Sequence, residues 1–211
     1  MNEIIPAINA ETFEEVSQKI KKVEPHAPWV HIDVADGTFT PNTLWHAASD
    51  LQGVETPLSI EAHLMIRDID TRYAEWLIPQ VKRLIIHLEA GHDIGYVVQN
   101  IKGAGKEVVL GILPETPWEK TRPFWGTIDG VLLLSVSPGL PGQAMDERTE
   151  DKIRGLHNAC PDCILEVDGG VNKKTAPLVF RAGASRVASA SAIFGESNIK
   201  EAIETLQHAS S

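Results

Sequence analysis

Short apolar segments alternate with amphipathic segments along nearly the whole chain. This alternation is typical of βαβ units, in which helices connect parallel strands. Eight apolar segments predict strands: Glu3–Ile8, Trp29–Val34, Leu58–Leu64, Arg83–His87, Glu107–Ile112, Gly130–Leu134, Ile164–Asp168 and Ser185–Ser189. Helical spacing fills most of the gaps and predicts these helices: Thr12–Val23, Ile69–Leu77, Asp93–Gly103, Glu147–Asn158, Thr175–Ala182 and Asn198–Gln207. The second and fifth gaps are less regular.

The number of strand–helix units selects between two kinds of α/β fold. Eight units in 211 residues fit a (β/α)₈ barrel better than an open doubly wound sheet. A dinucleotide-binding sheet usually carries a Gly-rich turn after its first strand, whereas residues 6–10 read Pro-Ala-Ile-Asn-Ala. We therefore predict a single-domain (β/α)₈ TIM barrel over residues 1–211.

The charge balance excludes several kinds of partner. A formal net charge of -10 and an isoelectric point near 5.2 argue against binding to nucleic-acid phosphates or to an anionic membrane surface. The sequence shows neither a signal-peptide pattern nor an apolar run long enough to span a bilayer. We expect a cytoplasmic protein.

The two cysteines, Cys160 and Cys163, lie in a Cys-Pro-Asp-Cys sequence. A zinc knuckle would need a second pair of ligands, and a thioredoxin-like motif would follow a strand, whereas this one precedes a strand. We predict two reduced thiols in a loop, as is usual in a reducing compartment.

Polar side chains close several of the predicted strands. In a (β/α)₈ barrel the carboxyl ends of the strands form the active-site face, so these side chains should lie together. Lys82 and Lys106 fall at strand beginnings, so the cluster lacks a cation. A divalent metal ion held by two histidines and two carboxylates would supply the charge. The cluster comprises His31, Asp33, Asp36, His63, His87, Glu89, Glu166 and Asp168.

Spacing alone leaves the ligand pair open. His31 and Asp33 share one face of a strand, and His87 and Glu89 have the same spacing. Asp36, which precedes a glycine, is interpreted as a turn residue, and Glu166 is expected in a lower layer of the barrel. The lysine positions disfavour Schiff-base aldolase chemistry. They also disfavour a decarboxylase with lysine between two aspartates, because Val34-Ala35 occupies that interval.

Residues 31–42, which read His-Ile-Asp-Val-Ala-Asp-Gly-Thr-Phe-Thr-Pro-Asn, resemble the signature of ribulose-phosphate 3-epimerases. Further segments are similar to that family in the same order along the chain: Ala62–Met65, His87–Glu89, Ser135–Gly139, Glu166–Val171 and Ser191–Phe194. The resemblance implies a (β/α)₈ barrel, in agreement with the strand count. It also implies an isomerase of the pentose phosphate pathway that interconverts D-ribulose 5-phosphate and D-xylulose 5-phosphate.

The resemblance further implies a ligand set and a catalytic pair. His31, Asp33, His63 and Asp168 would bind one divalent metal ion, which is iron, zinc, manganese or cobalt in this type of enzyme. Asp33 and Asp168 would be the acid and base, because epimerisation beside a ketone removes a proton from one face and returns one to the other. The intermediate would be an enediolate. We also expect a homo-oligomer.

The family grips phosphate with backbone N–H groups of glycine-rich loops. The resemblance assigns phosphate binding in this chain to Gly139, Gly142, Gly170, Ala190 and Ser191. Within the phosphate loops two positions depart from the family pattern: Pro141 has no N–H to donate, and Ala190 adds a Cβ where glycine is usual. The departures keep two alternatives open. One is an epimerase of another ketose or ketose phosphate, such as allulose 6-phosphate, and the other is a non-catalytic paralogue that binds metal or sugar phosphate.

Overall fold

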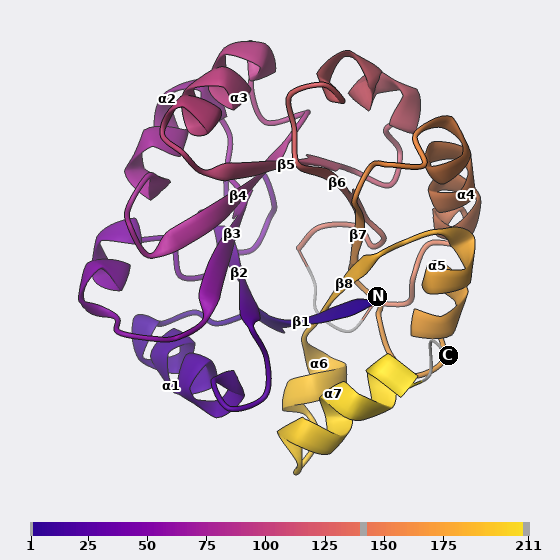
Figure 1. Cartoon of the computed structure of the whole chain (residues 1–211). Coiled ribbons are helices and arrows are strands. Elements are labelled where there is room, and N and C mark those ends of the chain that lie inside the picture. Colours follow the sequence, from indigo (N-terminus) through magenta and orange to yellow (C-terminus); the bar gives the residue numbers. More distant parts are fainter. Residues whose placement is uncertain (1, 140–142, 209–211) are drawn as a thin grey trace.

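Parallel strands close into a barrel in sequence order in the computed structural model, which describes residues 2–139 and 143–208 (Figure 1). The closure is made by β1, which pairs with β2 on one side and β8 on the other. The predicted (β/α)₈ barrel is thus confirmed. The described strands are β1 (Glu3–Ile8), β2 (Trp29–Ala35), β3 (Ser59–Met65), β4 (Val81–His87), β5 (Glu107–Ile112), β6 (Gly130–Leu134), β7 (Leu165–Asp168) and β8 (Arg186–Ser189).

Helices surround the barrel (Figure 1). They are α1 (Phe13–Val23), α2 (Ile69–Arg72), α3 (Ile94–Gly103), α4 (Thr149–Ala159), α5 (Ala176–Ala182), α6 (Ser191–Phe194) and α7 (Ile199–His208). The predicted helix at 69–77 divides into α2 and the 3₁₀-helix η2 (Tyr73–Trp76), and the two irregular gaps contain η1 (Ala48–Gly53) and η3 (Trp118–Phe124). Within the described residues, no helix has the length and apolar character needed to cross a membrane.

Helix α1 shows how the sequence builds these units. Thr12 caps its first turn by accepting a hydrogen bond from the Glu15 N–H at 3.3 Å. Acidic residues occupy the first turn and lysines the last, which suits the helix dipole. Val16, Ile20 and Val23 are buried against the barrel, so the apolar face of the helix covers the strands.

The outward and inward faces of the strands differ in polarity. Along β2 and β3 the outward residues, such as Ile32 and Leu64, belong to the large apolar core that includes α1 and α3. Inward residues on one side of the barrel form a small apolar cluster, Ile85, Val109, Leu132 and Leu134. The buried charged and polar residues of the interior come from β2, β3, β4 and β7: His31, Asp33, Glu61, His63, Arg83 and Glu166. A polar interior needs internal partners, and these partners define the site described below.

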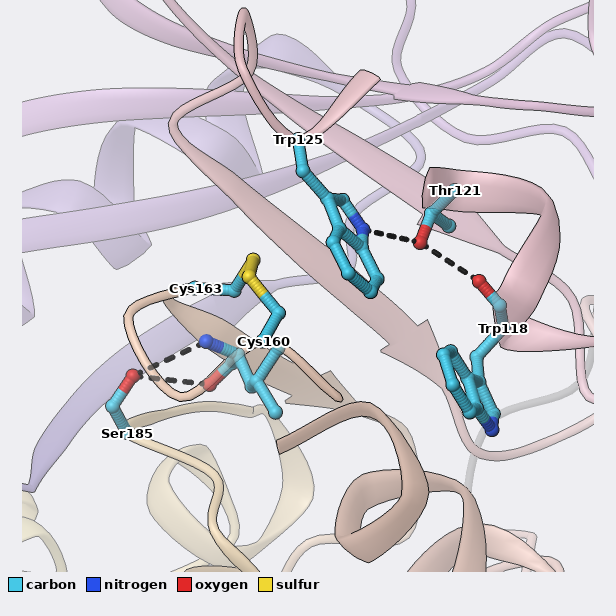
Figure 2. The surroundings of a disulfide bond; sticks show 7 residues. Trp118, Thr121, Trp125, Cys160, Cys163 and Ser185 are labelled. Atoms are coloured by element: carbon cyan, nitrogen blue, oxygen red, sulfur yellow. Dashed lines mark hydrogen bonds between the residues drawn. A yellow bond between two sulfur atoms is a disulfide. The ribbon is translucent and has the colours of Figure 1, made fainter. Parts of the chain in front are cut away.

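The prediction of two reduced thiols is wrong, because Cys160 and Cys163 form a disulfide (Figure 2). A turn follows the end of α4, in which the Cys163 N–H donates to the Cys160 carbonyl at 3.1 Å. The turn brings the two Cα atoms to 5.4 Å, inside the range that a disulfide requires. The pair lies before β7, at the end of the barrel opposite the carboxyl ends of the strands.

Candidate metal centre and active site

Four ligand atoms from three strands converge at the carboxyl end of the barrel. His31 and Asp33 come from β2, His63 from β3 and Asp168 from β7, and one ligand atom from each lies within 4.8 Å of those of the others. The register explains the arrangement, because Asp33 is paired with His63 across adjacent strands. The two histidines are fully buried, and Asp33 and Asp168 are 4% and 13% exposed.

The distances and donors in this group suit a divalent metal ion. His63 Nδ1 lies 2.9 Å from Asp33 Oδ1 and 3.5 Å from Asp168 Oδ2, and His31 Nε2 lies 3.2 Å from His63 Nδ1. Ligands at about 2.0–2.1 Å from a tetrahedral ion are roughly 3.3 Å apart. Two imidazole nitrogens facing each other beside two carboxylates are the donors that zinc, iron, manganese or cobalt accept. The group could therefore hold a metal ion.

Each histidine of the group has a buried partner on its other ring nitrogen. His31 Nδ1 lies 2.7 Å from Glu61 Oε1, and His63 Nε2 lies 2.8 Å from His87 Nε2. An ionised carboxylate only accepts, so His31 donates through Nδ1 and presents Nε2 to the ligand group. Such outer partners fix the orientation and tautomer of a metal-binding histidine.

A buried charge network lies beneath the ligands. Arg83 is 1% exposed, donates to Glu61, and stacks its guanidinium 3.9 Å from the Trp29 ring centroid. Glu166 points into the same layer, 3.6 Å from His31 Nδ1, as the sequence predicted. Burial and the neighbouring charge of Glu61 raise the pKa of Glu166 to about 7. Burial opposes ionisation of Glu61, but its bond to His31 and the charges of His31 and Arg83 bring its pKa to about 2.

The two aspartates of the group differ in their electrostatic environment. Burial and the charge of Asp33 raise the pKa of Asp168. Burial also disfavours the ionised form of Asp33, but hydrogen bonds and charge from His31 and His63 outweigh it and lower the pKa of Asp33. Burial alone would lower the pKa of His31, yet Asp33, Glu166 and Glu61 together raise it. One carboxylate is thus biased towards holding a proton and the other towards accepting one.

Besides Glu166, the remaining three residues of the predicted cluster, His87, Glu89 and Asp36, lie outside the ligand group. His87 contacts His63, and its Nδ1 lies 3.5 Å from Glu89 Oε2, so this pair supports a ligand rather than replacing one. Asp36 accepts hydrogen bonds from Thr38 and pairs with Arg72. Its role is structural, in agreement with the turn interpretation.

A cavity of about 350 Å³ opens above the ligand group. Asp33 and Asp168 line it, together with the predicted phosphate residues Gly139, Gly170, Ala190 and Ser191. Gly142 and Pro141 lie outside the described residues. Gly170 has φ +65°, and a Cβ there would come within 2.7 Å of the Met145 nitrogen. Only glycine fits this position without displacing the loop.

Three residues of the site were missed by the sequence reasoning. Asn9 donates from Nδ2 to Asp33 Oδ2 at 2.5 Å, and Lys19 from α1 lines the cavity. Arg83 is the buried cation of the lower layer. Arg83 alternates in phase with Ile85 and His87 on β4, and this spacing could have identified it as inward-facing.

Fold and site together define a (β/α)₈-barrel protein with a buried group of two histidines and two aspartates at the mouth of the barrel. The sequence model of the ribulose-phosphate 3-epimerase family matches residues 3–194. The chain is 34% identical to ribulose-phosphate 3-epimerase of Bacillus subtilis, with 98% of this chain and 99% of the relative covered. It is 31% identical to the Methanocaldococcus jannaschii enzyme of the same name, with 99% and 91% covered.

The chain belongs to the ribulose-phosphate 3-epimerase family and is an isomerase of the epimerase class. Solved structures with lower identity share the fold. The 3-hexulose-6-phosphate synthase of Salmonella typhimurium superposes with a TM-score of 0.74 at 14% identity, covering 99% of this chain and 98% of that one. Orotidine 5'-monophosphate decarboxylase from Sulfolobus solfataricus gives 0.67 at 12% identity, covering 100% and 98%.

Proposed function

We propose that the protein interconverts D-ribulose 5-phosphate and D-xylulose 5-phosphate, as a cytoplasmic homo-oligomer of the pentose phosphate pathway. The observation that carries the proposal is the placement of Asp33 and Asp168 in the wall of one cavity. They come from β2 and β7, and His63 contacts both. Family membership supports the substrate pair, because the relatives are ribulose-phosphate 3-epimerases by name.

The two carboxylates carry the proton transfers. Inversion at C3, beside the C2 ketone, requires removal of a proton from one face of the sugar and delivery of a proton to the other. In one direction the ionised aspartate takes the C3 proton and leaves an enediolate, and the other aspartate, which starts protonated, returns a proton to C3 from the opposite face. The reverse reaction exchanges these roles. General acid–base assistance of this kind is worth about 10²–10⁴-fold in rate.

His31, Asp33, His63 and Asp168 would hold one divalent ion, and iron, zinc, manganese and cobalt all suit this donor set. A bound ion of this kind supplies positive charge for the oxygen anion that develops beside C3. His31 and His63 serve as ligands alone, oriented by Glu61 and His87. Gly139, Gly170, Ala190 and Ser191, which line the same cavity, would bind the phosphate end of the sugar.

Proton exchange tests the proposal directly. Incubating D-ribulose 5-phosphate with the protein in D₂O should place deuterium at C3 alone and produce D-xylulose 5-phosphate, both visible by NMR. Asp33→Asn and Asp168→Asn should each abolish exchange, since each removes one of the two proton carriers. Near-normal turnover in either variant would exclude that aspartate from its role. Exchange with allulose 6-phosphate but not with the pentulose phosphates would replace the proposed substrate.

A further inference from the structure

The charges around the cavity bear on how it binds a substrate that carries a phosphate group. Asp33 and Asp168 line the cavity, and the protein carries a net charge of -10. A divalent ion in the ligand group would offset the charge of the two aspartates, but the phosphate of a ketose phosphate is a second, doubly charged anion and is stabilised by a cation of its own. Among the described residues that line the cavity, Lys19 is the only lysine, arginine or histidine.

Lys19 reaches the cavity from the second turn of α1. Its Nζ donates to the carbonyl oxygen of Asn9, just after β1, and lies 5.6 Å from the ring centroid of Phe194. Phe194 and Ser191 of α6 line the same cavity. Lys19 is half-buried, so its aliphatic stem is packed while its charged end stays at the cavity wall.

The ammonium group of Lys19 retains hydrogen-bonding capacity. A lysine has three N–H donors, and one is used on the Asn9 carbonyl. In the described part of the chain no carboxylate forms an ion pair with Lys19, in contrast to Lys102, which pairs with Asp129 at 2.7 Å. None of the described residues thus neutralises its positive charge.

We propose that Lys19 binds the phosphate group of the substrate and so makes the site selective for ketose phosphates over free ketoses. The inference rests on the proposed function, since it assigns the charged contact within that site. The sequence gives a reason for a side-chain cation here: Pro141 offers no N–H and Ala190 carries a Cβ, which weakens a grip built from backbone groups alone. A charge-assisted contact from lysine is stronger than a neutral one.

Two variants of Lys19 and one matched control test the inference. Lys19→Gln removes the charge. Lys19→Met removes the charge as well but keeps an unbranched apolar side chain over Phe194. Lys22→Gln is the control, because Lys22 lies on the same helix and lines only the neighbouring hollow that Lys19 also borders. Steady-state kinetics with D-ribulose 5-phosphate and with unphosphorylated D-ribulose are compared, and inorganic phosphate is titrated calorimetrically and as a competitive inhibitor.

Both Lys19 variants should raise KM for the sugar phosphate and weaken inorganic phosphate binding by about 10- to 100-fold. The value of kcat, and any turnover of D-ribulose, should change by less than about threefold. Lys19→Arg should recover most of the loss, and Lys22→Gln should resemble the wild type. A function that merely holds the Asn9 carbonyl would instead lower kcat for both sugars and leave phosphate binding intact.

Unchanged phosphate binding in soluble Lys19→Gln or Lys19→Met would overturn the inference, as would failure of the wild type to bind inorganic phosphate or any sugar phosphate. Loss of folding in both variants would show that Lys19 is required for the structure, and this result would also overturn the inference. Should the wild type bind inorganic phosphate but not epimerise D-ribulose 5-phosphate, the proposed function fails. The phosphate titration of the variants still decides the role of Lys19 in that case.

Discussion

Glu61 accepts a hydrogen bond from His31 at 2.7 Å while its other oxygen accepts one from the guanidinium of Arg83. The strand register produces this contact, because His31 on β2 is paired with Glu61 on β3, and Glu61 with Arg83 on β4. Glu61 is fully buried, so its charge depends on these two partners. The chain of contacts fixes the ring of a proposed metal ligand from below.

Replacing Glu61 by glutamine should weaken metal binding by about 10- to 100-fold, the usual effect of removing an outer-shell carboxylate. The amide no longer fixes the His31 tautomer. Chelator competition on the metal-loaded protein measures the affinity. Glu107→Gln is the matched control, because Glu107 also accepts from Arg83, at 2.7 Å, but does not contact His31. Equal losses in the two variants would trace the effect to Arg83 and not to the histidine.

Glu89 should stabilise the protein in a pH-dependent way. Burial opposes its ionisation, but the nearby His87 imidazole and hydrogen bonds from Thr116 and the Leu113 N–H lower its pKa to about 2, below its unfolded value. The ionised form is therefore favoured by folding, and its contribution is present above about pH 4.5 and lost as the pH falls through about 2. Glu89→Gln should reduce the free energy of unfolding by about 1–2 kcal/mol at pH 7, allowing for its partial exposure.

Urea unfolding between pH 7 and pH 2.5 measures this dependence. The difference between wild type and Glu89→Gln should shrink as the pH falls. Glu75→Gln, at an exposed position of η2, is the control and should show little difference at any pH. A Glu89→Gln difference that is constant with pH would mean that the carboxylate charge contributes nothing.

The fold was predictable because it depends on short-range pattern, whereas the ligand set was predicted from the family resemblance. The ends of β1, β5 and β6 agree with the predicted ones, since β-branched and aliphatic runs bounded by turn residues specify buried parallel strands. The ordered closure of the barrel then follows from the number of units. His31 and Asp33 could be placed on one face, but only the structure shows His87 behind His63, because that contact joins separate strands.

What sequence pattern could not supply was the set of long-range contacts. Lys19 is in the polar part of an amphipathic helix, and its reach into the cavity depends on how α1 lies beside α6, which no periodicity encodes. The prediction of reduced thiols in the Cys-Pro-Asp-Cys segment rested on compartment and motif spacing. The turn after α4 instead brings the two sulfurs together. Local geometry thus overrode a statistical argument.

The disulfide should contribute modestly to stability and nothing to activity. Cys160 and Cys163 are three positions apart in the sequence. For so short a loop, the entropy that the disulfide removes from the unfolded chain is worth about 1–2 kcal/mol of stability. The double variant Cys160→Ser/Cys163→Ser should therefore lower Tm by about 2–6 °C while kcat/KM stays unchanged, because the pair lies at the far end of the barrel. Dithiothreitol should lower the Tm of the wild type similarly and leave the variant unaffected; a loss of kcat/KM in the variant would contradict this separation.

Asn9 should position Asp33 for proton transfer. Its Nδ2 donates to Asp33 Oδ2 at 2.5 Å, and its backbone carbonyl accepts from Lys19, so it contacts both residues. Asn9→Ala removes the donor that orients the carboxylate and should lower kcat by about 10-fold with little change in KM. Asn42→Ala, at another cavity-lining position, is the matched control and should leave kcat near the wild-type value.

Asn9→Asp separates orientation from charge. A second carboxylate beside Asp33 disfavours its ionised form and raises its pKa. Where the ionised Asp33 is the base, the acid limb of the kcat profile should move to higher pH, and the loss of activity should be largest at low pH. Asn9→Ala should leave the position of that limb nearly unchanged, because alanine adds no charge. Identical pH profiles for the two variants would show that Asn9 holds the loop after β1 and does not act through Asp33.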